Sequence, residues 1–230
     1  MVSIAIDGPS GAGKSTLSRA LAKKLGLLYV DTGAMYRAVG LAALRAGAPT
    51  KNADAVESLL PHTEVSLRHL GGAQQVFLNG EDVSKTIRAE EVSMAASDVS
   101  AHPAVRAFLL DTQRRLAKEN DVIMDGRDIG TVVLPKAELK IFLTATAEDR
   151  AQRRYEELLA KGMQADYQKV LEDVKQRDYN DSHRAAAPLK KAEDAVELVT
   201  TGNSFEQSLE QLYALILQRL PQLGQGGKDG

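Results

Sequence analysis

The segment Gly8-Pro9-Ser10-Gly11-Ala12-Gly13-Lys14-Ser15 constrains the fold of this chain more than any other stretch. It fits the pattern Gly-x4-Gly-Lys-Ser/Thr in full, and it stands between an apolar run and a helix-like run. Glycines let consecutive backbone N–H groups turn toward phosphate oxygens, and a helix N-terminus adds partial positive charge at the same point. The competing interpretation is a glycine-rich turn before an ordinary helix. The flanking strand and helix favour a nucleoside triphosphate site made of Gly8, Pro9, Ser10, Gly11, Ala12, Gly13, Lys14, Ser15 and Thr16.

Two residues of this loop are expected to act on the phosphates directly. Lys14 is expected to reach the β- and γ-phosphates, which makes it a candidate catalytic residue, and the Ser15 hydroxyl is expected to hold Mg²⁺. Asp31 and Asp125 each end an apolar run. Either aspartate fits a water-mediated Mg²⁺ ligand or the cap of the following turn, and the sequence leaves both roles open.

Short apolar runs alternate with helix-like patterns along most of the chain. The runs predict buried parallel strands at residues 2–6, 27–30, 122–124, 139–143 and 196–199. The patterns between them predict helices at residues 14–25, 34–46, 103–118, 148–160, 167–178 and 204–220, the last with Ser204 as N-cap. This order predicts an α/β fold with a doubly wound parallel sheet, which binds ligands at the carboxyl ends of its strands.

Residues 64–83 break that order because apolar and polar residues alternate there. Gly71-Gly72 and Asn79-Gly80 supply turns, so the segment predicts a small antiparallel meander inserted into the α/β core. The predicted domain organisation is therefore a core of residues 1–63 and 84–223 with the insert between them. Residues 224–230 are polar and glycine-rich, and we expect a disordered tail.

Composition narrows the functional classes. A hydrophobic content of 43% suffices for a core, whereas a formal net charge of -2 and an aromatic content of 4% argue against an RNA-binding module. There is no cysteine for disulfides or thiolate metal sites. A core strand that begins at Val2 leaves no room for a signal peptide in this sequence, and no apolar run approaches membrane-spanning length. We therefore expect a cytoplasmic monomer that binds neither nucleic acid nor membranes.

The predicted helix 148–160 carries three arginines on one face, since Arg150, Arg153 and Arg154 have i, i+3, i+4 spacing. One interpretation is a solvated basic face balanced by neighbouring glutamates. The other is a mobile lid, at about residues 147–180, that carries arginines onto the transferred phosphate and excludes water. On the second interpretation Arg153 and Arg154 are candidate catalytic residues, and the part of Arg150 stays open.

Further motifs together resemble the bacterial-type cytidylate kinases, which are P-loop nucleoside monophosphate kinases. The resemblance covers nearly the whole chain, and its motifs lie at residues 6–15, 31–37, 78–84, 87–88, 125–133, 140–143, 177–184 and 187–189. Their joint order and spacing are specific, and they depart from the family only by conservative Ser/Thr choices. The resemblance implies a P-loop kinase fold: a five-stranded parallel sheet flanked by helices, with the small antiparallel insert and a helical lid.

It also implies a reaction of pyrimidine metabolism, in which a phosphoryl group passes from ATP to CMP or dCMP with Mg²⁺ present. A kinase for another monophosphate or for a small metabolite is the alternative in the same class. The insert argues against the small metabolite. A nucleotide-dependent switch is the alternative from another class, although the chain has no Asn-Lys-x-Asp base motif.

Residue by residue, the resemblance implies a CMP site. Arg37 and Arg127 would clamp the acceptor phosphate, Asp181 would accept hydrogen bonds from the sugar with help from Arg177, and Arg184 would reach the base. The full implied set is Thr32, Arg37, Ser97, Arg106, Arg127, Asp128, Arg177, Asp181 and Arg184. Taken singly, each arginine also fits a surface ion pair. Arg177, Asp181 and Arg184 share one helix face if the helix continues that far.

Overall fold

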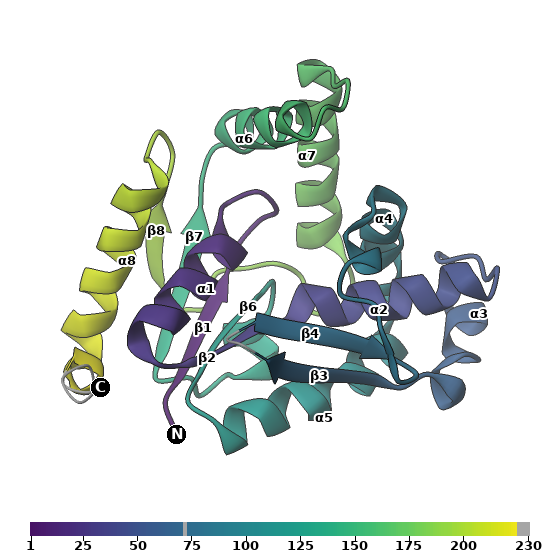
Figure 1. Cartoon of the computed structure of the whole chain (residues 1–230), viewed down its shortest axis with the longest axis horizontal. Helices are drawn as coiled ribbons and strands as arrows, with labels where there is room; N and C mark the ends of the chain where they lie inside the picture. Colours follow the sequence, from purple (N-terminus) through teal and green to yellow (C-terminus); the bar gives the residue numbers. More distant parts are fainter. Residues whose placement is uncertain (71–72, 225–230) are drawn as a thin grey trace. The chain divides into compact units, whose positions relative to one another are not determined.

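The computed structural model describes residues 1–70 and 73–224. Its contacts divide the chain into two units, which we call unit 1 (Met1–Tyr29 with Asn120–Gly230) and unit 2 (Val30–Glu119). The elements of both are labelled in Figure 1. The predicted boundaries of core, insert and lid stay predictions.

Unit 1 is built on a five-stranded sheet with the strand order β2-β6-β1-β7-β8. Its strands are β1 (Ser3–Asp7), β2 (Leu28–Asp31), β6 (Val122–Gly126), β7 (Leu139–Thr144) and β8 (Val196–Val199). The central strand β1 pairs in parallel with β6 and with β7, so Asp7 stands beside Gly126 on one side and Phe142 on the other. The predicted parallel sheet is confirmed, with strand ends shifted by one or two residues.

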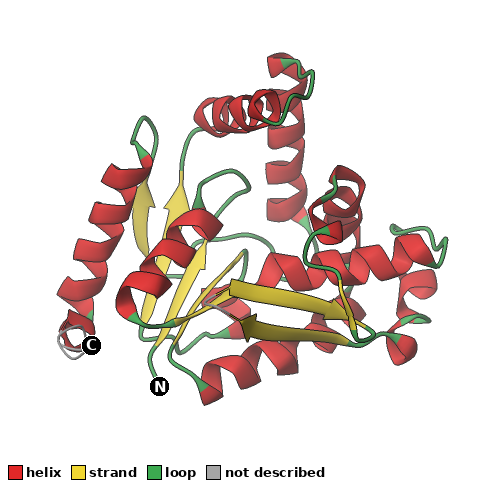
Figure 2. Ribbon diagram, viewed as in Figure 1, coloured by secondary structure: helices red, strands yellow, loops and turns green. Residues whose placement is uncertain are grey.

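The helices of unit 1 are α1 (Lys14–Leu25), α6 (Ala147–Ala160), α7 (Tyr167–His183) and α8 (Phe205–Arg219), drawn in red in Figure 2. Buried aliphatic side chains of the sheet pack against Leu17 and Leu21 of α1 and against Leu212 and Ile216 of α8. Ser204 caps α8 in a reciprocal capping box with Gln207, as predicted. A smaller apolar cluster joins α6 to α7 through Ala151, Val170 and Val174.

Unit 2 holds a three-stranded antiparallel sheet, which confirms the predicted meander. Its strands are β3 (Val65–Leu70), β4 (Ala73–Leu78) and β5 (Glu81–Asp82), and its helices are α2 (Thr32–Arg45), α3 (Ala53–Glu57), α4 (Glu90–Val99) and α5 (Pro103–Glu119). Asn79 and Gly80 both have positive φ, at 50° and 82°, as a tight hairpin turn between β4 and β5 requires. The predicted turn at Gly71-Gly72 lies outside the described residues.

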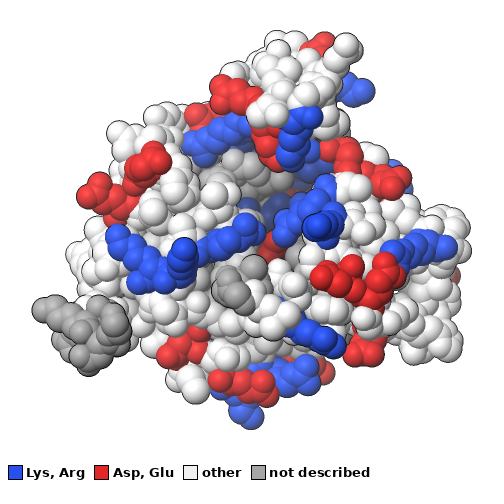
Figure 3. All heavy atoms as spheres, in the orientation of Figure 1, with Lys and Arg blue, Asp and Glu red and all other residues white. Residues whose placement is uncertain are grey.

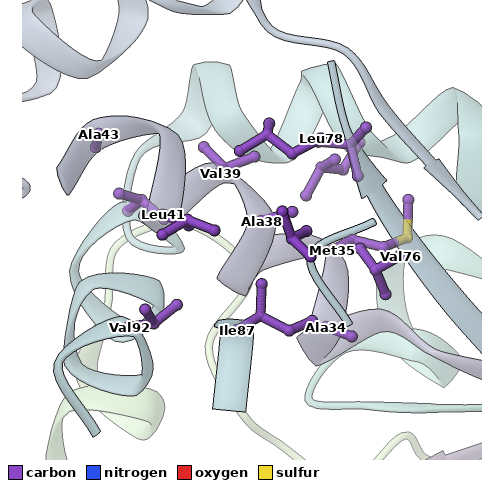
Figure 4. Close-up of a cluster of buried hydrophobic side chains, with 14 of the residues drawn as sticks. Ala34, Met35, Ala38, Val39, Leu41, Ala43, Val76, Leu78, Ile87 and Val92 are labelled. Carbon is purple, nitrogen blue, oxygen red and sulfur yellow. The ribbon is translucent and has the colours of Figure 1, made fainter. Parts of the chain in front are cut away.

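The core of unit 2 is aliphatic. Side chains from α2, β4, α4 and the 3₁₀ helix Thr86–Arg88 meet there, and Figure 4 shows how they converge. Among them are Met35, Val39, Val76, Ile87 and Val92. Each of these five is at most 2% exposed. Burial of such side chains is the main stabilisation available to this unit.

Several element boundaries differ from the prediction. Helix α2 begins at Thr32 rather than at residue 34, because the Asp31 carboxylate accepts from the Ala34 N–H at 3.0 Å and caps the helix early. Helix α7 continues past residue 178 to His183. Helices α3 and α4 and a π-helix at Ile129–Val133 were not predicted. Gly224, expected in the tail, ends a 3₁₀ helix, and residues 225–230 lie outside the described residues.

Both signs of charge appear on the face of the molecule drawn in Figure 3, in line with 29 basic and 31 acidic residues. Within residues 1–70 and 73–224, no helix is both long enough and apolar enough to cross a membrane.

Candidate active site

The phosphate-binding loop leaves β1 at the carboxyl edge of the sheet. A Cβ on Gly8 would lie 1.9 Å from the Leu143 carbonyl oxygen of β7, so only glycine lets the loop pass there. Gly13, at φ 85°, precedes α1 without a side-chain cap, and the first turn of α1 carries no acidic residue. The partial positive charge of this helix end is therefore left for an anionic ligand.

Lys14 lies folded over the loop. Its Nζ donates to the Pro9 carbonyl oxygen at 2.7 Å, and the side chain is buried. Burial and the charge of Arg127 lower the pKa of Lys14 to about 7, while Asp125, Asp181 and Asp7 act in the opposite direction. A phosphate bound in the loop would favour the charged lysine.

Ser15 and Asp125 meet beside the loop. The Ser15 hydroxyl donates to Asp125 Oδ2 at 2.7 Å, and the Tyr29 hydroxyl donates to the other carboxylate oxygen at 3.1 Å. A hydroxyl and a carboxylate are the hard oxygen donors that suit Mg²⁺, which keeps its remaining positions for water and phosphate. This pair therefore fits the predicted metal. Asp31, which the sequence left equivalent to Asp125, caps α2 and lies 3.5 Å from Arg88.

Four of the residues implied to bind CMP come together in unit 1. Arg127 Nε donates to Asp181 Oδ2 at 2.7 Å. Arg184 lies 3.7 Å from Asp128 Oδ1 and 4.0 Å from Asp181 Oδ1, and its Nε donates to the Ala187 carbonyl at 2.7 Å. Burial disfavours the charge of Asp181, but Arg127 outweighs it and lowers the pKa of that carboxyl below its usual value. Oppositely charged groups are thus concentrated beside the loop.

Helix α7 positions part of this cluster. Arg177 lies one turn before Asp181, as the spacing predicted. The helix ends at His183, however, and Arg184 has an extended backbone with φ -63° and ψ 141°. The condition under which Arg184 would share the helix face of Arg177 and Asp181 is therefore not met, and the contact with Ala187 places this side chain instead.

The three arginines of α6 have three different environments. Arg153 donates to the Thr200 carbonyl at 2.6 Å, and its Nη1 lies 3.9 Å from where a Cβ on Gly13 would stand. Arg154 pairs with Glu157 at 3.1 Å. Arg150 is buried and donates to the carbonyl oxygen of Ser10. A uniform solvated face does not describe them, because one of the three is buried.

The other implied CMP residues belong to unit 2. Thr32 is the buried first residue of α2, and Arg37 lies farther along that helix. Arg106 of α5 donates to the Ser100 carbonyl at 3.1 Å, and its guanidinium lies 5.4 Å from the ring centroid of Tyr36. The Ser97 carbonyl accepts from the Ser100 hydroxyl at 2.9 Å. Within unit 2, Arg106 thus lies over the ring of Tyr36, the residue before Arg37, and binds Ser100, which lies one turn after Ser97.

Asp7 was not predicted as a site residue. It accepts from the backbone N–H groups of Ile129 and Gly130 at 2.8 and 2.7 Å, and so ties the end of β1 to the segment that follows Asp128. Burial raises the pKa of Asp7 to about 6, although both N–H donors oppose the shift. A carboxylate directly after the apolar residues Ile4, Ala5 and Ile6 of the same strand was the available signal.

Comparisons with known proteins identify the family of this chain. The family model described as cytidylate kinase matches residues 4–218. A cytidylate kinase of Caldicellulosiruptor saccharolyticus is 52% identical over 214 residues, covering 93% of this chain and 95% of that protein. One from Syntrophotalea carbinolica is 49% identical over 216 residues, covering 94% and 92%. The crystal structure of an uncharacterized protein from Eubacterium ventriosum has the same fold, with a TM-score of 0.52 at 12% identity over 94% of this chain and 98% of its own. On the family match and these identities, the chain belongs to the cytidylate kinase family.

Proposed function

We propose that the chain transfers the terminal phosphoryl group of ATP to CMP or dCMP and releases ADP with CDP or dCDP. The observation that carries the proposal is the cluster of Arg127, Asp181, Arg184 and Asp128 in the same unit as the phosphate-binding loop. Such a reaction needs no protein nucleophile, because the acceptor oxygen already belongs to an anionic phosphate. Positioning and charge neutralisation of two repelling phosphates are what the protein must supply.

On the donor side, the loop from Gly8 to Thr16 binds the phosphates of ATP through its backbone N–H groups. Lys14 neutralises the β- and γ-phosphates, and Ser15 with Asp125 holds Mg²⁺. When bound, the metal supplies charge neutralisation of the phosphate oxygens. Arg153, which lies beside Gly13, and Arg154 act on the transferred group when the lid of α6 and α7 closes and excludes water.

On the acceptor side, Arg127 and Arg37 grip the 5′-phosphate with paired N–H donors. Asp181 and Arg177 bind the sugar, with Thr32 beside the phosphate. Arg184, Ser97, Arg106 and Asp128 recognise the base. The Asp128 carboxylate accepts from the cytosine amino group and repels the O4 carbonyl of uracil. Because Asp128 is only 4% exposed, leaving its carboxylate without a partner costs free energy.

An acceptor panel tests the proposal. Purified protein is incubated with ATP, Mg²⁺ and one of CMP, dCMP, UMP, AMP, GMP or shikimate, and ADP is measured against a reaction without acceptor. We expect ADP with CMP and dCMP. ADP in the acceptor-free reaction at the same rate would indicate a switch or ATPase, and ADP with shikimate alone would indicate a small-metabolite kinase.

The same assay tests the base contact. Asp128→Asn can turn its amide to donate to O4 of uracil, so the ratio of kcat/KM for CMP over UMP should shrink, mostly through loss of CMP activity. An unchanged ratio would remove Asp128 from base recognition.

A monomeric state and a cytoplasmic location belong to this proposal as well. The monomeric state is supported by the lack of evident spare apolar surface in the sequence, and the location by the absence of cysteine. Sedimentation velocity at micromolar protein tests the first, and fractionation of cells of the source organism tests the second.

A further inference from the structure

Arg150 is the least exposed of the arginines on the lid helix α6, at 4%. Its Nε donates to the Ala145 carbonyl oxygen at 2.9 Å, at the end of the connection from β7. Its two terminal nitrogens bind both carboxylate oxygens of Asp178 on α7, at 2.9 and 2.5 Å. A buried guanidinium is tolerated only when it is paired and hydrogen-bonded in this way, so its position is closely determined.

The same guanidinium contacts the phosphate-binding loop. Nη1 donates to the Ser10 carbonyl oxygen at 2.9 Å. A Cβ on Gly11 would lie 3.2 Å from the Arg150 Cβ, so the stem of the arginine also lies directly against the loop. Arg150 therefore touches two successive residues of the loop that the proposed function assigns to ATP.

Asp178 connects Arg150 to the residues of α7 that the proposed function assigns to CMP. It immediately follows Arg177, and it lies at i-3 from Asp181 on the same helix. Asp181 in turn holds Arg127 at 2.7 Å. The contacts run without interruption from the Ser10 carbonyl through Arg150 and Asp178 to one end of α7, which carries residues assigned to CMP.

We propose that Arg150 is a positioning residue that couples the donor loop to the acceptor site: the loop geometry adopted with bound ATP is transmitted through Arg150 and Asp178 to Arg177 and Asp181. This rests on the proposed function for the identity of the two ligands. Its consequence is reciprocal, since a ligand in the loop must tighten CMP binding by the same factor as CMP tightens the loop ligand.

Other contacts already hold the two lid helices together. The apolar cluster of Ala151, Val170 and Val174 lies between them, and Lys175 of α7 lies 3.4 Å from Glu148 of α6 on the exposed side. Neither contact involves the loop. Glu148→Gln therefore perturbs the same helix pair while every hydrogen bond of Arg150 and Asp178 stays in place, and it serves as a matched control. Because the charge of Glu148 also acts on Arg150, Lys175→Gln breaks the same pair as a second control.

The test is the dissociation constant of CMP, measured by calorimetry without and with a saturating non-hydrolysable ATP analogue and Mg²⁺. In the wild type we expect the analogue to tighten CMP binding at least about fivefold. In Arg150→Met, which keeps an apolar stem but no donors, this factor should fall to near one. Glu148→Gln should retain the wild-type factor.

If Arg150→Met does not fold, as judged by circular dichroism, Asp178→Asn decides. It keeps the arginine but weakens the paired contact, and it should lower the factor part of the way to one. An unchanged factor in the folded variant, a wild-type factor of one, or an equal loss in Glu148→Gln would each overturn the proposal. These outcomes are separate from failure of the proposed function, which would appear as no ADP from ATP and CMP in the wild-type assay.

Discussion

The two units bury different kinds of side chain. Unit 1 buries charged groups at and around its sheet, namely Asp7, Lys14, Asp125, Asp128, Lys140 and Arg150. In the described part of unit 2 the buried charged residue is Asp31, which caps a helix, and the core is otherwise aliphatic.

This difference shows that unit 1 has the less stable interior, at the side chains that form its candidate active site. A buried charge costs free energy even when paired, whereas a buried aliphatic side chain contributes about 1.5–3 kcal/mol. Unit 1 accepts that cost at Lys14 and Asp125, which we assign to phosphate transfer, and also at Lys140, which pairs with Asp194. Substitutions in unit 1 should therefore affect activity more than stability, and substitutions in the core of unit 2 should do the reverse.

The strongest test is Lys14→Met, which keeps the buried apolar stem and removes the charge. We expect kcat for ATP and CMP to fall on the order of 1,000-fold, because the developing phosphate charge loses its nearest cation. Circular dichroism and thermal melting should show a folded protein. Near-normal turnover would contradict the assignment of the loop.

Ile87→Ala is the corresponding change in unit 2. Ile87 is fully buried among the aliphatic side chains of that core. Its truncation should lower the free energy of unfolding by about 3 kcal/mol, measured by urea denaturation. Leu70→Ala, at a side chain that is 60% exposed, is the control and should change little. A small loss in Ile87→Ala would mean that the aliphatic core is not what holds unit 2.

Arg127→Ala tests a residue of unit 1 that we assign to the acceptor phosphate. It removes a charge-assisted contact worth about 2 kcal/mol, so KM for CMP should rise and kcat should fall while ATP affinity stays nearly the same. Arg37→Ala should act in the same direction. Arg45→Ala breaks an exposed pair with Glu81 and serves as control. Loss of ATP affinity instead would place Arg127 at the other nucleotide.

A pH dependence of the free energy of unfolding is expected from Asp7. Its pKa rises from 3.8 to about 6 on folding, so the native state binds more protons than the unfolded chain between those values. The contribution of Asp7 to stability is therefore present at low pH and is lost as the pH rises through about 6. Compared with Asp7→Asn, the wild type should lose up to about 1.4 kcal/mol per pH unit in that window. The free energies of unfolding of the two proteins are measured by denaturant titration. A difference between them that stays constant from pH 4 to pH 7 would contradict the raised pKa of Asp7.

Much of the fold could be predicted because its signals are local. Continuous apolar runs indicated the parallel strands, period-two alternation the small meander, and period-3.6 patterns most helices. Helix α4 was also within reach, since Val92, Ala95, Ala96 and Val99 have helical spacing after two glutamates. The π-helix at Ile129–Val133 was not, because Asp7, 122 residues earlier than Ile129 and on the neighbouring strand β1, accepts from its first N–H groups. Contacts over such sequence distances leave no local pattern.

The candidate site could also be predicted only in part. Motif residues such as Arg127 and Asp181 were predicted, but not that they bind each other across 54 residues of chain. Helical spacing placed Arg150, Arg153 and Arg154 on one face, but it does not predict which residues that face contacts. Arg150 is buried against Ser10 because the end of β7 fixes where α6 begins. That placement depends on the tertiary structure and leaves no local sequence pattern.

The passage of the loop beneath Leu143 has a consequence for how this chain can diverge. Any side chain at position 8 would overlap a carbonyl oxygen of β7, and that strand is itself fixed by its pairing with β1. No single substitution relieves the overlap, and none elsewhere opens the space without separating two central strands. Position 8 therefore accepts only glycine for as long as β1 and β7 stay paired.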